Sequence, residues 1–233
     1  MKTIGLIGGM SWESSIEYYR IINETAKQKL GGLHSAKSLM VTVDFAEIEK
    51  LQHEDRWEEA GKILVNCAQS LERGGADFIV LCTNTMHKLA DQIIANVNIP
   101  FLHIADATAE KIVAAGMKRI GLLGTRFTME HDFYKGRLIH DFGLEVLTPN
   151  RSDRGIIHRV IYDELVQGRI VDASRNEYKR IMNDLIVQGA EGIILGCTEI
   201  ELLVKQNDSP VPLFPTTSIH AVAAVEKALE DHR

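Results

Sequence analysis

The stretch GAEGIILGCTEI at residues 189–200 decides the fold. Its first two residues end a helix, residues 192–195 form an apolar run typical of a buried strand, and GCTE then opens toward another helix. The stretch GADFIVLCTNTM at residues 75–86 repeats this pattern without a gap, which aligns Thr83 with Cys197. We infer an internal duplication.

Two further pairs of similar segments extend the duplication over most of the chain. The opening KTIGLIGGMSW at residues 2–12 returns as KRIGLLGTRFT at residues 118–128. More loosely, IPFLHIADA at residues 99–107 returns as VPLFPTTSI at residues 211–219. Because these segments keep their order, we expect two similar halves that face each other, each offering a strand end to a shared cleft.

Short apolar runs alternate with longer segments of helical period, and this alternation predicts an α/β fold. Each half should hold a parallel sheet flanked by helices. The first half is expected to comprise residues 1–103 and 214–233, and the second half residues 104–213. Two helices inserted in the second half are expected over residues 153–166 and 172–187.

Three local patterns carry more detailed expectations. A helix over residues 14–29 should be capped by Ser14 or Ser15, since serine oxygens accept from free N–H groups. The strand over residues 38–43 should lead into a loop, because the sequence after it is polar and charged. Residues 128–141 should form one continuous helix.

The composition excludes several classes of protein. The formal net charge of −6 is spread along the 233 residues, and no basic block suggests nucleic acid. No apolar run approaches the length that spans a membrane, and the opening IGLIGGM is too short and glycine-rich for a signal-peptide core. Cys67, Cys82 and Cys197 lie far apart and form no CxxC pair. We therefore expect free thiols in a reducing cytoplasm rather than disulfides or zinc.

Small and polar residues follow four of the expected strands. In parallel α/β sheets, ligands bind at the carboxyl ends of the strands. Hydroxyls, amides and the free N–H groups of helix N-termini at these positions suit a carboxylate ligand. The four segments are Gly8–Ser11, Cys82–Thr85, Gly124-Thr125 and Gly196–Glu199.

The cysteines and His87 each have an ordinary structural interpretation as well. Cys67 lies on an apolar helix face and is expected in the core, whereas Cys82 and Cys197 could both be buried strand-end thiols. Cys197, however, lies at a strand-to-helix break, where a helix N-terminus is expected to lower the pKa of a thiol. His87 fits a capping or packing role better than that of a base.

These motifs resemble those of the aspartate/glutamate racemase family over nearly the whole chain. GCTE at residues 196–199 is similar to the family's second signature, and the stretch ending NTMH at residues 84–87 is similar to its first. The resemblance implies two pseudo-symmetric flavodoxin-like halves with the active site in the cleft between them. It also implies racemisation of acidic amino acids by one cysteine from each half, without pyridoxal phosphate or a metal.

The resemblance also implies roles for individual residues. Cys197 would be the second-half cysteine. The α-carboxylate would be held by Asn84, Thr85, Thr125 and Thr198. Met10 would lie at the first turn, Glu199 near the ammonium group, and Gln52 would come from the early loop that contacts the distal group.

One position departs from the family pattern. The family's first cysteine directly precedes Asn-Thr, and Thr83 stands there in this chain, with Cys82 one residue earlier. Strand alternation would point Cys82 to the other side of the sheet, although a bulge could bring it round. The gapless repeat aligns Thr83 with Cys197, so Thr83 is the expected partner.

Together these residues predict a racemase of aspartate, glutamate or a similar polar amino acid. Proton transfer on opposite faces of an α-carbon needs two acid–base groups, which a duplicated fold can supply. Because Thr83 is the weaker base, we expect the L-to-D direction to be favoured. The family resemblance also implies that the protein is a homodimer. Two alternatives remain: a one-cysteine decarboxylase or isomerase of a dicarboxylic acid, and an inactive amino-acid-binding protein on the same scaffold.

Overall fold

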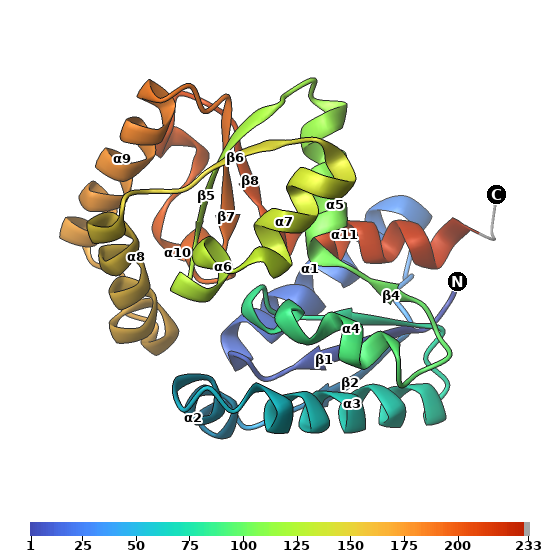
Figure 1. Ribbon diagram of the computed structural model, residues 1–233. Coiled ribbons are helices and arrows are strands. Elements are labelled where there is room, and N and C mark those ends of the chain that lie inside the picture. The colour runs from blue at the N-terminus through green and yellow to red at the C-terminus, as the bar shows by residue number, and fades with distance from the viewer. Residues whose placement is uncertain (231–233) are drawn as a thin grey trace. The chain divides into compact units, whose positions relative to one another are not determined.

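The two halves of the sequence fold into two parallel sheets of four strands each, as the duplication predicts. The computed structural model describes residues 1–230. The chain divides into two compact units (Figure 1). Unit 1 holds Met1–His103 and the chain from His220 onward, and unit 2 holds Ile104–Ile219. The chain returns to unit 1 at His220 rather than at residue 214, because the last strand pairs within the second sheet.

Unit 1 is built on a sheet in the order β2-β1-β3-β4, in which all the neighbouring strands are parallel. Its elements are β1 (Ile4–Gly8), α1 (Trp12–Leu30), β2 (Ser38–Thr42), α2 (Phe45–His53), α3 (Trp57–Arg73), β3 (Phe78–Leu81), the 3-10 helix η1 (Thr85–Leu89), α4 (Ala90–Ile94), β4 (Phe101–Leu102) and α11 (Thr216–Leu229). Helix α11 begins in unit 2 and belongs to unit 1 from His220.

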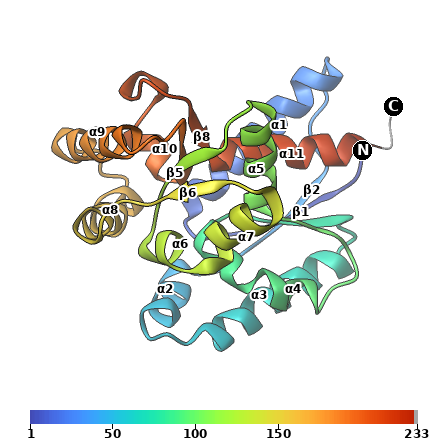
Figure 2. The same cartoon turned by 45° about the horizontal axis from the view of Figure 1, so that its top comes forward.

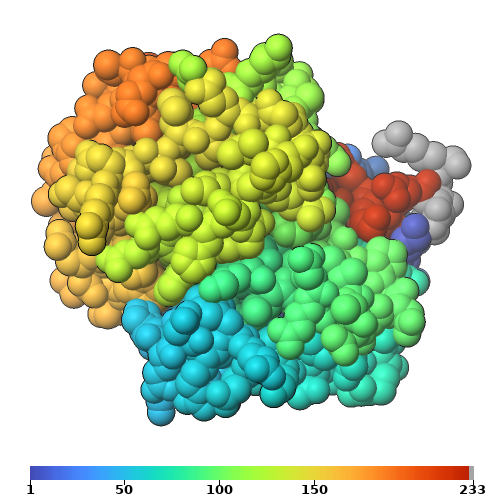
Figure 3. All heavy atoms as spheres, viewed as in Figure 1, coloured from blue at the N-terminus to red at the C-terminus, as the bar shows by residue number. Residues whose placement is uncertain are grey.

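Alternating side chains of the central strands fill two cores in unit 1. Ile79 and Leu81 pack with residues of α3 and α4 on one face of the sheet, in what we call the α3-side core. Val80 and Cys82 pack with residues of α1 and α11, including Tyr18, on the other face, in the α1-side core. Both faces are therefore covered, which explains why β3 is apolar without interruption. In the space-filling view, the visible surface of unit 1 is formed mainly by the cyan to green segments (Figure 3).

Unit 2 repeats the same strand order as β6-β5-β7-β8, again with parallel neighbours. Its elements are α5 (Ile104–Ala114), β5 (Arg119–Gly124), α6 (Arg126–Glu130), α7 (Asp132–Phe142), β6 (Glu145–Leu147), α8 (Arg151–Asp163), η2 (Leu165–Gln167), α9 (Asp172–Val187), β7 (Gly192–Gly196), α10 (Ile200–Leu203), η3 (Gln206–Asp208) and β8 (Leu213–Pro215). Residues of α8, α9 and α10 form one core with residues of β7, and residues of α5 and α7 form the other with residues of β5. These helices can be followed in Figure 2.

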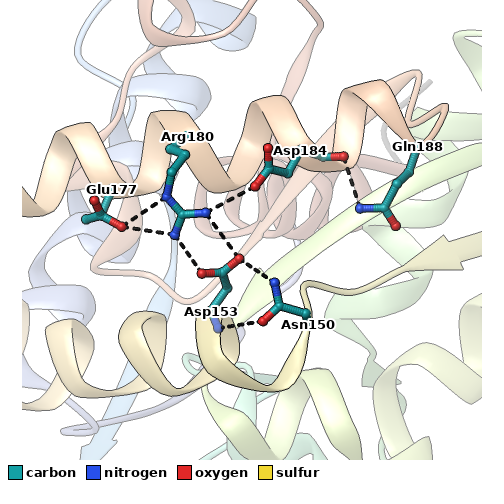
Figure 4. Close-up of polar contacts among 6 residues, drawn as sticks. All are labelled: Asn150, Asp153, Glu177, Arg180, Asp184 and Gln188. Atoms are coloured by element: carbon teal, nitrogen blue, oxygen red, sulfur yellow. Dashed lines mark hydrogen bonds and ion pairs between the residues drawn. The ribbon is translucent and has the colours of Figure 1, made fainter.

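The inserted helices α8 and α9 are joined by a buried carboxylate. Asp153 of α8 accepts from Arg180 of α9, with Oδ1 2.6 Å from Nη2, and from Asn150, with Oδ2 2.7 Å from Nδ2 (Figure 4). Hydrogen bonding to Arg180 holds the pKa of Asp153 below its usual value. Arg180 also pairs with Glu177 and Asp184 on its own helix.

Three local expectations are wrong. The segment after β2 is the helix α2 rather than a loop, with Ile48 and Leu51 on its buried side. The helix expected over residues 128–141 is split in two at His131, whose backbone is extended. Helix α1 begins earlier than expected, because Ser11 caps it by accepting from the N–H of Ser14. Among residues 1–230, no helix combines the length and apolar character needed to cross a membrane.

Candidate active site

In unit 1, the polar segments expected to bind a ligand follow neighbouring strands at the same edge of the sheet. Strands β1 and β3 run parallel with Ile7 opposite Leu81, and Cys82 donates its N–H to the carbonyl of Ile7 at 2.9 Å. The turn that holds Met10 therefore lies beside the start of the segment Cys82–Thr85. This is the carboxyl end of the sheet, where ligands bind in folds of this class.

The turn after β1 is fixed by close packing and by serine side chains. Gly9 has a φ of +92°, and a Cβ there would lie 2.2 Å from the carbonyl oxygen of Val43, so only glycine fits. The N–H of Gly9 donates to Ser15 Oγ at 2.8 Å, and Ser15 Oγ donates to the carbonyl of Ser11 at 2.9 Å. The side chain of Met10 packs in the α3-side core, which also contains Met86.

Cys82 and Thr83 have different surroundings. Cys82 is fully buried in the α1-side core with Tyr18 and Ala221, and burial raises the pKa of its thiol. Thr83, the next residue, is a buried polar residue. Its N–H donates to the carbonyl of Leu81 at 2.9 Å.

The other predicted residues of unit 1 are also buried polar groups. Asn84 and Thr85 follow Thr83 directly, where η1 begins. Gln52 comes from α2, and its Nε2 lies 2.8 Å from the sulfur of Met86 on η1. The structure thus brings Gln52 beside the segment that holds Asn84 and Thr85, although the sequence had suggested only an early loop.

Unit 2 shows a matching arrangement at the ends of β5 and β7. Gly124 lies opposite Gly196, and a Cβ on Gly196 would lie 2.7 Å from the carbonyl oxygen of Leu123, so the two strands approach too closely for a side chain. Thr125 follows at once and caps α6 by accepting from the N–H of Thr128.

Cys197 is bonded to a carboxylate inside the protein. Its sulfur donates to Glu199 Oε2 at 3.0 Å, and the hydroxyl of Thr198 donates to the same oxygen at 2.6 Å. All three residues are buried. The three consecutive polar residues of the GCTE motif therefore form one hydrogen-bonded group.

The expected lowering of the pKa of Cys197 is wrong. Burial, the nearby charge of Glu199 and the hydrogen bond to it hold the pKa of this thiol well above its usual range. Helix α10 has only four residues, so its N-terminus offers little to oppose these effects. Cys67, by contrast, packs in the α3-side core as expected.

Sequence reasoning missed Glu201, a second carboxylate near Cys197. Glu201 accepts from the N–H of Thr217 at 3.0 Å and from Ser218 Oγ at 3.2 Å, and burial raises its pKa. Its charge adds to the effects that raise the pKa of Cys197. The sequence did not indicate that Glu201 acts on Cys197, because acidic residues are common in the first turn of a helix. Within residues 1–230, no group of three or more His, Cys, Asp or Glu side chains could hold a metal ion.

The family is decided by comparison with known sequences. The model of the Asp/Glu/Hydantoin racemase family matches residues 7–224. The chain belongs to this family. Racemase relatives include the broad specificity amino-acid racemase RacX of Bacillus subtilis (strain 168), which is 26% identical over 179 residues, 74% of each chain.

Solved structures of family members have the same fold. A Yersinia pestis protein is 56% identical, with a TM-score of 0.93 over 98% of this chain and 100% of that one. PH1733 of Pyrococcus horikoshii OT3, an aspartate racemase homologue, is 37% identical, with a TM-score of 0.84 over 98% of this chain and 99% of that one. The racemase family and its two-part α/β fold are thus established for this chain.

Proposed function

We propose that this chain racemises aspartate, glutamate or a similar polar amino acid without pyridoxal phosphate, with Cys197 and Thr83 as its two acid–base groups. The observation that carries the proposal is the buried hydrogen bond of 3.0 Å from Cys197 Sγ to Glu199 Oε2. Removal of the α-proton needs a positioned base, and Glu199 can take the thiol proton and so convert Cys197 into one.

The first step forms the base. The S–H bond of Cys197 breaks and its proton passes to Glu199 Oε2, and the resulting thiolate then takes the α-proton of the L-substrate. Negative charge moves from oxygen to sulfur within the buried pair, so burial opposes this step less than it opposes loss of the proton to water. Glu199, expected near the substrate ammonium, is assigned here to the thiol as well.

The developing charge on the substrate needs hydrogen-bond donors. Removing the α-proton leaves an enolate-like carboxylate, which hydroxyl and amide groups stabilise more strongly than they stabilise the substrate. We assign this role to Asn84 and Thr85 from unit 1 and to Thr125 and Thr198 from unit 2. All four are buried polar residues at strand ends, which supports the assignment.

Thr83 is assigned as the second acid–base group. The packing of Cys82 among apolar side chains supports this choice over the neighbouring cysteine. A threonine hydroxyl is protonated near neutral pH, so Thr83, or a water that it orients, returns a proton readily but removes one poorly. Glu199 then releases to solvent the proton that it took from the thiol, and Thr83 or its water takes one up, which restores the resting state. The L-to-D direction is therefore favoured in kcat, whereas the two values of kcat/KM stay equal because the equilibrium constant is one.

The test follows proton exchange and inversion separately. Each enantiomer of aspartate and glutamate is incubated with the protein in heavy water, after dialysis against a chelator and a carbonyl reagent. We expect inversion by chiral chromatography, with L-substrate gaining α-deuterium before it inverts. Cys197→Ser should abolish both signals, and the core variant Cys67→Ser should retain them. Optically pure product with loss of a carboxyl group would indicate a decarboxylase, and binding without turnover a binding protein; either result contradicts the proposal.

We also propose that the protein is a homodimer formed through α1. Trp12, Ile16 and Tyr19 lie on one side of this helix and are 64%, 52% and 55% exposed. Arg20 pairs with Glu17 next to these apolar side chains, so charges of both signs border the surface that a second copy would cover. Light scattering should give twice the chain mass, and Ile16→Glu should give the single mass. A monomeric wild-type protein would contradict the assignment.

A further inference from the structure

His87 is bonded to the main chain of the residue assigned as the second acid–base group. The ring is only 2% exposed, and its Nδ1 lies 2.7 Å from the carbonyl oxygen of Thr83. A carbonyl can only accept, so Nδ1 carries the proton and donates it to Thr83. This bond runs from η1 back to the short segment between β3 and η1.

The bond completes the hydrogen bonding of the Thr83 main chain. Its N–H already donates to the carbonyl of Leu81 at 2.9 Å, and its carbonyl accepts from His87. On the N-terminal side, the neighbouring Cys82 is held in the apolar core. With the backbone fixed at both polar groups, the Thr83 hydroxyl can move only by rotation about χ1, among a few staggered positions.

The imidazole is itself held by a second layer of rings. His87 packs against His103 with ring centroids 4.6 Å apart, against Phe101 at 5.5 Å and against His220 at 5.9 Å. His220 is bonded at both nitrogens, with Nε2 2.9 Å from the carbonyl of Leu102 and Nδ1 2.8 Å from the hydroxyl of Tyr18. The donor is therefore set in a packed aromatic layer rather than on a mobile side chain.

We propose that His87 is a positioning residue that fixes the Thr83 hydroxyl for the return of the proton. The inference rests on the proposed function, but it assigns a role that the family motifs alone do not give. The proposed role concerns one step only: His87 supports the return of the proton at Thr83 and does not affect the removal of the α-proton by Cys197. A small misplacement of a reacting group costs up to about a hundred-fold in rate, so loss of this single bond should be visible in turnover.

The test compares two substitutions of His87 with a matched control. His87→Phe keeps a packed ring and removes the donor, whereas His87→Asn retains an N–H group near the position of Nδ1. His103→Phe is the control, since His103 packs against the same imidazole, whereas the bond to the Thr83 carbonyl comes from His87 Nδ1. Each variant is given L-aspartate and L-glutamate in heavy water, and α-deuterium uptake and inversion are measured together with the melting temperature.

The expected signature is a change in the ratio of the two rates. His87→Phe should slow inversion about ten-fold or more while exchange of the L-substrate stays within about two-fold of wild type. His87→Asn should recover much of the inversion, and His103→Phe should keep the wild-type ratio. An unchanged ratio in His87→Phe, or an equal fall of both rates, overturns the positioning role. A wild-type protein that neither exchanges nor inverts would instead overturn the proposed function.

Discussion

At the scale of single residues, the hydrogen bond between Cys197 and Glu199 allows a direct test of how the thiol is activated. Glu199→Gln keeps the size and a hydrogen-bonding oxygen, but an amide cannot take the thiol proton. We expect kcat to fall by about a hundred-fold or more, the usual effect of losing a proton acceptor, with a smaller change in KM. Steady-state kinetics with each enantiomer measure this.

The neighbouring carboxylate serves as the control for that experiment. Glu201 also raises the pKa of Cys197 by its charge, but it accepts from Thr217 and Ser218 rather than from the thiol. Glu201→Gln should therefore leave kcat much closer to wild type than Glu199→Gln does. Equal losses would mean that charge near the thiol, not proton transfer, explains the role of Glu199.

The buried thiol of Cys82 predicts a loss of stability in alkali. Its pKa in the folded protein is raised by burial, whereas in the unfolded chain the thiol ionises near about 8.5. Above that pH the unfolded state binds fewer protons than the folded state, so the free energy of unfolding falls as the pH rises. Between pH 8 and pH 10 this one group should account for about 2 kcal/mol.

Urea unfolding at the two pH values measures this contribution. Cys82→Val removes the titrating group with little change in volume, and it should lose about 2 kcal/mol less than the wild type over the same interval. All other titrating groups are the same in the two proteins, so they should lower the free energy of unfolding equally in both over this pH interval. An identical loss in the two proteins would show that Cys82 is not protected from ionisation.

At the scale of elements, the carboxylate between α8 and α9 is the part of unit 2 most open to a stability test. Arg180→Met would leave Asp153 buried with Asn150 but without its cation. Because Arg180 is 43% exposed and stays partly hydrated, we expect a loss of about 1–2 kcal/mol at pH 7 rather than the larger cost of a fully buried pair.

The pH dependence separates the ion pair from packing. The pKa of Asp153 is held low in the folded wild type, so the pair stabilises the fold above the ordinary aspartate pKa and is lost as the pH falls through the lowered value. The wild type and Arg180→Met should converge in acid. Glu177→Gln is the control, since it leaves the Asp153 contact in place. A gap between wild type and Arg180→Met that stays the same from neutral pH into acid would point to packing alone.

The sequence predicted most elements but not all, for identifiable reasons. The buried strands β3 and β7 were evident because both faces are covered and the apolar run is continuous. Helix α2 was missed because only Ile48, Leu51 and Gln52 are buried in it, and the rest of its nine residues read as a polar loop. The break between α6 and α7 lies at His131, which carries no proline or glycine signal.

At the scale of the whole molecule, the duplication explains why the fold was predictable. Gapless alignment of residues 75–86 with 189–200 predicted equivalent strands, and both occupy the third position in sheets of the same order. The raised pKa of Cys197 could not be predicted in the same way. It depends on the Glu199 side chain turning back to the thiol in a buried setting, and spacing along the chain does not specify that rotamer.

The chain path also bears on synthesis at the ribosome. Unit 2 is one continuous stretch, whereas unit 1 is closed by α11, whose Ala221, Ala224 and Val225 complete its α1-side core. Unit 1 emerges from the ribosome first, but its core cannot be completed until these residues of α11, which follow unit 2 in the chain, have been translated. Nascent chains that carry a spacer after residue 219, so that unit 2 is clear of the ribosomal exit tunnel, should show a protease-resistant unit 2 and a cleavable unit 1. The part of the protein translated first would then be the last to become stable.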